Sequence, residues 1–460
     1  MKRFLVGAIF ITGMPIFAGS LFLTLEDAKE LAVKQNQTIL AAQEKLKAQK
    51  ANVDIARSGF FPSVSFLGSY TRILKIPAFT APSPHYEFLP LNVYNLLGDQ
   101  IGYTDPTLIM TGMDTMKLEF GRPESYIFRG SIQQPLFTWG SLWNAYKIAS
   151  LGYEVEKENY EKKENDIKMQ VTRSFLGTIL VQKTLKLTED SYQQMKRHTE
   201  QVEILYNNGM VQKLDLLRAR VELSNLRTQV VHSKERVEIA FSGLKTLLAL
   251  PPDTLLVLDD KPIYKPFDIT LDEATEYALK KRPDLIGMRL TREMTANALA
   301  IERAQNKPKL ALIYNYDYKK PVRLMENKWG PDWNVSLALS MPIFSGGSHI
   351  NKVRQKIAQL NQVDFGLISL ENAVRLEVKS NWFKLERGKE IMSYQEENVT
   401  RAEEAYRLAE KQYKNGLITN LEYMDTQLAL MRARLEQLSS LVNYNIAQEE
   451  LWTAMGGFKP

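Results

Sequence analysis

Acidic side chains follow two Asn-Gly steps in this sequence at similar distances. Asp215 lies six residues after Gly209, and Glu422 and Asp425 lie six and nine residues after Gly416. Carboxylates that share one narrow aqueous space can stay ionised and attract cations. Carboxylates in the first turns of a helix instead complement the positive end of the helix dipole. The residues alone leave both roles open.

Three methionines form a second group with possible chemistry. Met110, Met113 and Met116 are spaced by three, and His85 lies upstream of them. Thioether sulfur is a ligand that Cu(I) and Ag(I) favour. The same spacing is typical of a short helix that packs a methionine stripe onto the surface beneath it, and we favour that interpretation. We therefore expect no metal site, with these methionines as weak candidates.

The rest of the sequence points away from catalysis. We find no nucleophile–base constellation, metal-ligand spacing or phosphate loop, and His198, His232 and His349 are isolated along the chain. The formal net charge of +6 is spread over segments of mixed sign without a Lys/Arg block, so we expect no nucleic-acid partner. These observations predict a protein that is not an enzyme and carries no cofactor.

The N-terminus has the layout of a secretory signal peptide. Basic residues precede an apolar run from Phe4 to Phe17, and small residues follow at 18–20. We predict a signal peptide over 1–20 that is removed on export; the alternative is an uncleaved anchor that reaches Leu23. The chain has no cysteine, and its 24% of charged residues make it too polar for a bundle of membrane helices. Packing or oligomerisation must therefore hold the exported protein together.

The sequence contains two copies of one long unit. The recurring segments are 24–28 and 270–274, displaced by 246 positions, and then 135–137 and 342–344, and 206–209 and 413–416, displaced by 207. The first copy therefore holds 39 extra residues, which we place within about 76–124. Solenoid repeats are only ~20–50 residues long, so each copy should be a complete structural half. We assign the halves to 21–250 and 270–460, with a proline-rich linker over 251–269.

Each half contains two segments in which apolar and polar residues alternate. The apolar positions are Val64, Phe66 and Tyr70; Tyr126, Phe128 and Ile132; Leu310, Leu312, Tyr314, Tyr316 and Tyr318; and Trp333, Val335, Leu337, Leu339 and Met341. Such alternation is typical of transmembrane barrel strands, which turn apolar side chains to lipid and polar ones to the lumen. The alternative is an ordinary half-buried sheet. The predicted signal peptide and the aromatic strand ends favour the barrel.

The remaining segments predict helices. A seam of apolar residues spaced by seven, which includes Val171, runs from Gly140 to Tyr206, and its counterpart runs from Gly347 to Tyr413. Shorter helices are predicted from Leu25 to about Arg57, from about Leu214 to Leu250, and from about Leu421 to Met455. In the first half, the helix before the strands and the return helix together roughly match the long helix in length, so they can lie end to end along it.

Four strands in one chain cannot close a membrane barrel. Small closed barrels need about eight strands, and lipid tolerates no open sheet edge. Two copies would supply eight strands around a filled interior, whereas three would supply twelve around a lumen. The sequence thus predicts an oligomer of a mixed α/β membrane protomer.

Short motifs mark the same points in both halves. They are the strand exits Pro135-Leu-Phe137 with Gly140 and Pro342-Ile-Phe344 with Gly347, and the Tyr-x-x-Gly turns at 206–209 and 413–416. Their order, repeated twice over essentially all of the mature chain, resembles the TolC family of outer-membrane efflux proteins. The resemblance implies a homotrimer with a twelve-stranded barrel in outer-membrane lipid and a tunnel of coiled-coil helices in the periplasm. It also implies a periplasmic adaptor and an inner-membrane pump or ABC transporter, which together export small molecules or polypeptides.

The resemblance also assigns site residues. The family's periplasmic constriction falls on Glu422, Asp425, Asp215 and Tyr413, but Ile418 stands where a gate arginine is expected, so the constriction can be charged or hydrophobic. The adaptor is expected to dock on the apolar tips formed by Gly209, Met210, Val211, Gly416 and Leu417.

The insertion lies between two strands of the first half and is expected outside the cell. The alternative function is a periplasmic coiled-coil adaptor or scaffold anchored by its N-terminal segment. That alternative leaves the four amphipathic strands unexplained.

Overall fold

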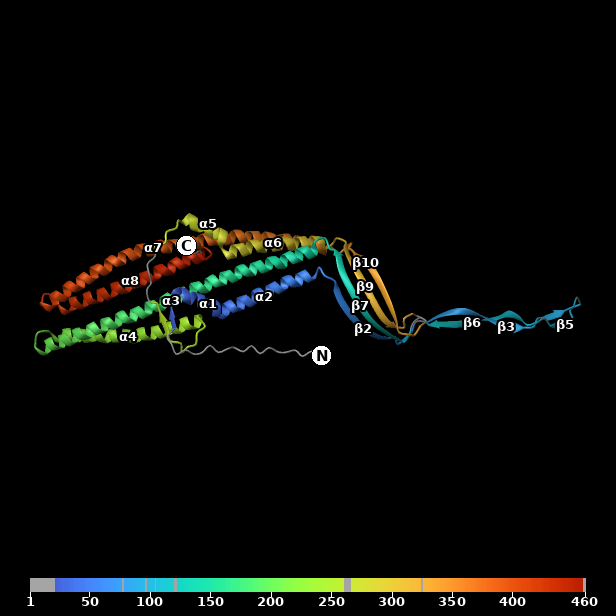
Figure 1. Ribbon diagram of the computed structural model, residues 1–460, viewed down its shortest axis with the longest axis horizontal. Coiled ribbons are helices and arrows are strands. Elements are labelled where there is room, and N and C mark those ends of the chain that lie inside the picture. The colour runs from blue at the N-terminus through green and yellow to red at the C-terminus, as the bar shows by residue number, and fades with distance from the viewer. Residues whose placement is uncertain are drawn as a thin grey trace. The chain divides into compact units, whose positions relative to one another are not determined.

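The computed structural model describes residues 21–76, 78–95, 97–103, 105–119, 122–259, 266–323 and 326–457. It divides into two compact units (Figure 1). Of the described residues, the helical unit comprises those within 21–54, 147–299 and 354–457, and the strand unit comprises those within 55–146 and 300–353. The predicted signal peptide lies outside the described residues.

The order of elements repeats between the halves. The first half contains β1 (Leu21–Leu23), α1 (Leu25–Gln35), α2 (Gln37–Ser58), β2 (Ser63–Arg72), β3 (Ala78–Leu89), β4 (Asn92–Tyr94), β5 (Gln100–Tyr103), β6 (Thr107–Glu119), β7 (Glu124–Phe137), α3 (Ser141–Asn207) and α4 (Lys213–Leu247). After β8 (Leu256–Leu258), the second half contains α5 (Leu271–Lys281), α6 (Pro283–Ala304), β9 (Lys309–Lys320), β10 (Gly330–Ser340), α7 (Ser348–Lys414) and α8 (Asn420–Ala454). The extra length of the first half forms β3 to β6.

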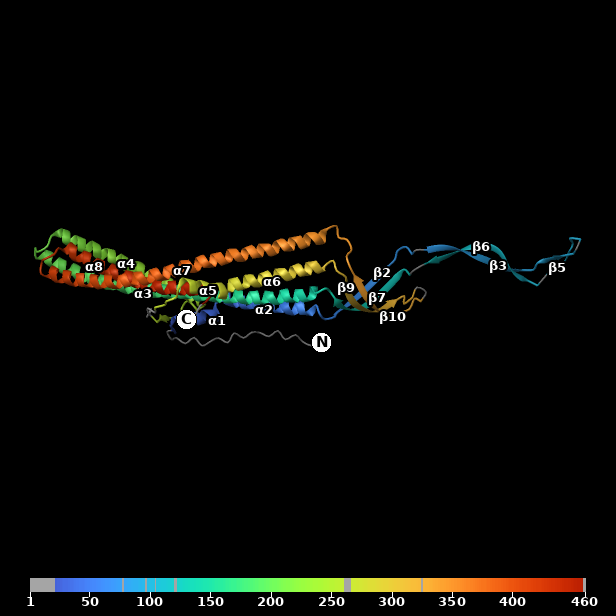
Figure 2. The same cartoon turned by 90° about the horizontal axis from the view of Figure 1, so that it is seen from above.

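The helical unit is organised around its two longest helices. α3 and α7 contain 67 residues each, and Val171 of the predicted seam of α3 is fully buried. The return helix α4 lies along the second part of α3, where the Thr199 hydroxyl donates to the Ala219 carbonyl at 3.3 Å. α2 lies along the first part, where the Gln43 amide donates to the Tyr160 hydroxyl at 3.2 Å (Figures 1 and 2). The two short helices thus follow one another along the long one, as their lengths predicted.

Each half builds its own apolar core in the helical unit. The first core gathers side chains of α1 to α4 with β1 and β8, and includes Phe175 and Leu244. The second gathers α5, α6, α7 and α8, and includes Leu385 and Tyr444. Each large apolar side chain buried in this way stabilises the fold by about 1.5–3 kcal/mol. The duplicated sequence therefore folds into two equivalent packing units that share α8, because Val442 of α8 belongs to the first core.

The helix predicted from Leu25 to about Arg57 is two helices, and the single-helix prediction was wrong. The chain turns at Asn36, whose backbone is extended (φ −63°, ψ 127°). The Asn36 side chain donates to the Leu247 carbonyl at 2.9 Å and accepts from the Thr38 amide at 2.9 Å. Asparagine competes with helical hydrogen bonding through such local contacts, which explains the break.

The segment between the halves is also more ordered than a plain linker. Leu256–Leu258 form β8, which pairs in parallel with β1 in the register Leu21 to Leu256. Leu23 and Leu258 are buried in the first core. The start of the described chain is therefore fixed to the segment that joins the two halves.

The strand unit contains a four-stranded antiparallel sheet in the order β10-β9-β7-β2. Paired residues in an antiparallel ladder share a face of the sheet. Leu337 pairs with Leu312, and Ile132 pairs with both Val64 and Tyr314. The alternating apolar residues of all four strands therefore lie on one face. This face agrees with the lipid-facing surface predicted from the sequence.

The opposite face of the sheet is polar and internally hydrogen-bonded. Arg129 makes two hydrogen bonds to the Asp317 carboxylate, at 2.7 and 2.8 Å. Beside this pair, the Ser131 hydroxyl lies 2.6 Å from Asn315 Oδ1, and the Asn315 amide donates to Asn334 at 3.2 Å. Such contacts between neighbouring strands fix the register from the polar side.

Aromatic rings gather at one end of the apolar face. Trp329 stacks on Phe128 and Tyr318 at centroid distances of 5.8 and 5.4 Å, and Tyr70 lies 4.9 Å from Tyr126. Aromatic girdles of this kind mark the interface between lipid and water in barrel proteins. The cluster lies at the end from which β2 runs into the insertion.

The insertion is a two-stranded ribbon, so the predicted short helix was wrong. β3 pairs antiparallel with β6, and β4 with β5 further out. Met110, Met113 and Met116 all lie in β6. The register shifts where Tyr86 pairs with Met110 and His85 with Gly112, which leaves Thr111 as a bulge. A bulge changes the side-chain alternation, which is why a spacing of three here resembles a helix.

Among the described residues, no helix has a stretch long and apolar enough to cross a membrane.

Candidate constriction and docking surface at the helix tips

The two helix hairpins of the helical unit end in the same kind of turn. Gly209 and Gly416 have φ values of +76° and +70°, a conformation that L side chains rarely adopt. The Met210 amide donates to the Leu205 carbonyl and the Leu417 amide to the Gln412 carbonyl, each at 2.9 Å. Each turn is therefore a Schellman cap that ends a long helix and redirects the chain into the return helix.

The tip residues differ in exposure. Met210 and Leu417 are each 72% exposed, so both turns present one large apolar side chain to water. Val211 packs against a small core that contains Val202 and Leu216, and Ile418 is half-buried. Of the predicted docking residues, the structure thus leaves Met210 and Leu417 free for a partner.

Glu422 has a structural role in the turn. The Thr419 amide donates to its carboxylate at 2.7 Å, and the Glu422 amide donates back to the Thr419 hydroxyl at 3.2 Å. This reciprocal pair is a capping box that begins α8. The hydrogen bonds from the Thr419 backbone and hydroxyl lower the pKa of Glu422. Glu422 is therefore an ionised carboxylate, exposed at the helix start.

Asp215 and Tyr413 come close together, although they lie in different halves of the sequence. Tyr413 is half-buried, and burial, followed by the charge of Asp215, raises its pKa. Within the described part of the chain, the Tyr413 hydroxyl has no hydrogen-bond partner. The charge of Asp215 therefore acts on Tyr413 electrostatically, without a hydrogen bond between the two side chains.

A contact that sequence reasoning missed joins the same elements. His198 of α3 is only 3% exposed, and its Nε2 lies 2.6 Å from the Asn420 side-chain oxygen. The Asn420 amide donates in turn to the Asp215 carbonyl at 3.3 Å. The His198 ring also packs against Tyr413 and Tyr423, at centroid distances of 5.2 and 4.7 Å. This group, which we call the His198 cluster, connects α3 and α4 to α7 and α8.

The His198 cluster holds its imidazole neutral. Burial lowers the pKa of His198, and the hydrogen bond to Asn420 opposes that shift only in part. Tyr423 donates to or accepts from the Tyr406 hydroxyl at 3.0 Å, and burial raises its pKa. The side chains of the His198 cluster are therefore uncharged. They occupy the region for which the sequence allowed either a charged or a hydrophobic constriction.

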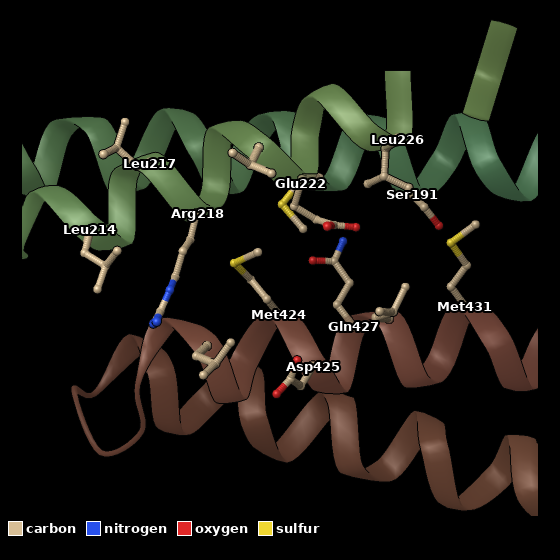
Figure 3. Close-up of a pocket in the computed structure, with 14 residues that line it drawn as sticks. Ser191, Leu214, Leu217, Arg218, Glu222, Leu226, Met424, Asp425, Gln427 and Met431 are labelled. Carbon is tan, nitrogen blue, oxygen red and sulfur yellow. The ribbon is translucent and has the colours of Figure 1, made fainter. Parts of the chain in front are cut away.

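Asp425 lies one turn further along α8, at the edge of a groove between α4 and α8 (Figure 3). The groove has a volume of about 450 Å³ and is mainly apolar. In Figure 3, Met424, Gln427 and Met431 point from α8 toward α4, and Arg218 reaches from α4 toward α8. Asp425 itself is exposed. The two acidic candidates of α8 therefore differ in role. Both are exposed, but only Glu422 belongs to the capping box of the helix.

The three methionines of the insertion do not share one face of the ribbon. Met110 and Met113 fall on one face of β6, and Met116 falls on the other. No group of three or more His, Asp or Glu side chains within the described residues is arranged to hold a metal ion. His85 instead lies 3.3 Å from both Glu87 and Asp114.

The chain combines two long helix hairpins with an amphipathic four-stranded sheet. Together these elements define a class of protein, the export channel that consists of a membrane barrel and a helical tunnel. The family model for outer membrane efflux proteins matches residues 110–250 and 275–457, and the chain belongs to this family. Its members are channels rather than enzymes. The protein is therefore an outer-membrane channel for export, with a tunnel in the periplasm, that works with a periplasmic adaptor and an inner-membrane pump.

Individual relatives support the assignment. The chain is 24% identical to the probable efflux pump outer membrane protein TtgC of Pseudomonas putida, over 94% of this chain and 83% of TtgC. It is 20% identical to the alkaline protease secretion protein AprF of Pseudomonas aeruginosa, over 71% of this chain and 69% of AprF. Among solved structures, the outer membrane protein VceC of Vibrio cholerae superposes with a TM-score of 0.72 at 15% identity, covering 94% of this chain and 96% of VceC.

Proposed function

We propose that three copies of this chain form one continuous export duct and that the His198 cluster keeps its periplasmic end narrow. The observation that supports assembly is the sheet with two open edges, β2 and β10. Three copies rather than two would leave a lumen inside the closed barrel. These edge strands run in opposite directions, so β2 of one copy can pair antiparallel with β10 of the next. Three copies then give an even-numbered closed barrel without an exposed edge.

Fractionation of the cell envelope tests this assembly. We expect the protein in the outer membrane, as a trimer that resists detergent until it is heated. Recovery in the inner membrane or in the soluble periplasm would instead support the alternative of a coiled-coil adaptor or scaffold. The proposed lipid contact of the apolar sheet face depends on the same outcome.

The constriction is proposed to combine acidic and uncharged parts. Glu422 and Asp425 are exposed near the tip of each copy, so three copies would place six carboxylates around one axis. At about 7 Å in water each pair of charges repels by only ~0.6 kcal/mol, so all six can remain ionised and attract cations. Asp215 and Tyr413 contribute at the contact between the helix hairpins, where the Asn420 amide donates to the Asp215 carbonyl, and Ile418 is half-buried in the turn.

Substitution of Glu422 by glutamine tests the acidic ring without unfolding the turn. Glutamine also completes a capping box, so α8 should still begin at the same residue. We expect Glu422→Gln combined with Asp425→Asn to reduce the preference for cations and to weaken block by divalent cations in planar bilayers. The matched control is Glu273→Gln, which removes the charge of the equivalent capping box at Thr270 of α5. Unchanged selectivity in the double variant would remove both acids from the constriction.

The adaptor is proposed to bind the exposed side chains of Met210 and Leu417. They are equally exposed at equivalent positions in the two turns, so a trimer offers six similar apolar contacts. A partner with paired helices could cover them while the Schellman turns keep their shape. The relatives are associated with an efflux pump and with protease secretion, so we propose that the pump, rather than this docking surface, selects the cargo.

Photo-cross-linking in living cells tests the docking surface. A photoreactive amino acid at Met210 or Leu417 should yield adducts with a periplasmic adaptor, identified by mass spectrometry. Leu255 provides the control, because it is 71% exposed but lies in the segment between the halves. Equal adduct formation from all three positions would contradict a specific role for the tips.

A further inference from the structure

The ribbon of β3 and β6 has two unlike faces. Pairing places six residues on one face: Pro84 with Met113, Tyr86 with Met110, and Phe88 with Leu108. We call these six residues the ribbon stripe. The bulge at Thr111 is what brings Met110 and Met113 to the same side. These six residues carry no charge, and the next charged residue on the same face is Lys117, which pairs with Thr80.

The opposite face of this stretch is polar. It carries Ser83 paired with Asp114, and Glu87 paired with Ile109. His85 lies between the acids, with Nε2 3.3 Å from Glu87 and Nδ1 3.3 Å from Asp114. A face with two carboxylates in each copy is suited to water and would repel the same face of another copy.

Within the described residues, the ribbon stripe has no cover. Phe88 is 69% exposed and Met113 is 67% exposed. Tyr86, Leu108 and Met110 are each more than half exposed. A two-stranded ribbon is at best marginally stable on its own in water, and contiguous exposed apolar residues usually mark an interaction surface. The ribbon therefore requires a partner for one face only.

The chain itself indicates which partner is nearest. Only five residues separate the end of β2 from the start of β3, and β2 is the edge strand at which the next copy is proposed to pair. The ribbons of three copies must consequently leave the same barrel rim. Tethering at such short range makes contact between ribbons effectively intramolecular.

We propose that the three ribbons associate through their ribbon stripes into one extracellular β structure that extends the barrel. The proposal rests on the trimer proposed above. Around a threefold axis equal residues face one another, so the ribbons can pack together only along a stretch whose inward side chains carry no charge. The ribbon stripe meets that condition, whereas Glu87 and Asp114 on the other face do not. The polar faces then form the outer surface of the extension.

Single cysteines test this association, because the chain has no cysteine of its own. Phe88→Cys and Met110→Cys place a thiol on the ribbon stripe, and Glu87→Cys and Asp114→Cys place one on the polar face as matched controls. After mild oxidation of whole cells, we expect disulfide-linked dimers on denaturing gels from the first pair, several-fold more than from the second. The same samples, run without heating, report whether the trimer has formed.

These outcomes distinguish failure of the ribbon association from failure of the proposed trimer. The association of ribbons would be overturned if the trimers stayed intact without heating but the ribbon-stripe variants formed no disulfide. It would also be overturned if cysteines on both faces formed disulfides equally. If the unsubstituted protein itself gave no trimer on the unheated gel, the proposed assembly would be overturned instead. The ribbon could also rest on the membrane surface. In that case a bimane label in the Phe88→Cys variant would be quenched by brominated lipids and no dimer would form, which also overturns the proposal.

Discussion

Replacing Leu337 with arginine is expected to destabilise the assembled barrel by about 2–4 kcal/mol, the cost of a basic side chain at the middle of the lipid-facing surface. Leu337 lies near the middle of β10, is paired with Leu312, and is 62% exposed in the single chain. Because three copies each carry the substitution, the effect on the trimer should be large. The expected readout is a lower temperature or urea concentration for loss of the unheated trimer on gels.

The neighbouring residue provides the control for this prediction. Ser336 lies on the polar face of the same strand, paired with Ile313. Ser336→Arg should leave the trimer nearly as stable as the unsubstituted protein, because its charge can reach the aqueous lumen. Equal destabilisation by both substitutions would contradict the assignment of the two faces.

Acidification is expected to loosen the contact between α3 and the tip of α7 and α8. The pKa of buried His198 lies below its ordinary value of 6.5. As the pH falls below about 6.5, a separated tip gains a proton on the imidazole, whereas the packed tip does not. The packed form therefore keeps its full stability above this pH and loses it as the pH falls toward the folded-state pKa. Each unit of depression corresponds to about 1.4 kcal/mol, a tenfold shift toward the separated tip.

Single-channel recordings from about pH 8 to about pH 5 can measure this shift. We expect the open probability to rise on acidification and His198→Gln to remove that rise, since glutamine cannot titrate. Tyr413→Phe is the control because the Tyr413 hydroxyl makes no hydrogen bond among the described residues. A flat wild-type response, or the same rise in His198→Gln, would show that the cluster does not govern the tip.

The sequence predicted those parts of the fold whose signal is periodic. Alternation assigned Leu312 and Leu337 to one face of the sheet, and the spacing of seven placed Val171 in the helix core. The two displacements of the duplication located the insertion before β7. These signals are local, so they do not depend on which distant segment becomes the neighbour.

The missed features depend on distant partners or on a local irregularity. Nothing near His198 indicates that Asn420 will lie beside it, because 222 residues separate them along the chain. The ribbon was mistaken for a helix because one bulge at Thr111 disturbs the alternation. By contrast, the capping box of Thr419 and Glu422 was readable from their spacing alone, and it would have identified the structural role of Glu422.

The two open edges of the sheet have a consequence for how subunits join. β2 and β10 differ in sequence, so each contact between copies joins unlike edges, head to tail. Such a contact has no twofold axis of its own, so subunits joined in this way must close into a ring in which every β2 meets a β10. The ring therefore has a direction, and a subunit with one damaged edge can still capture a neighbour at its intact edge. Mixed with normal subunits, it would leave incomplete rings, so edge defects should be dominant in the cell.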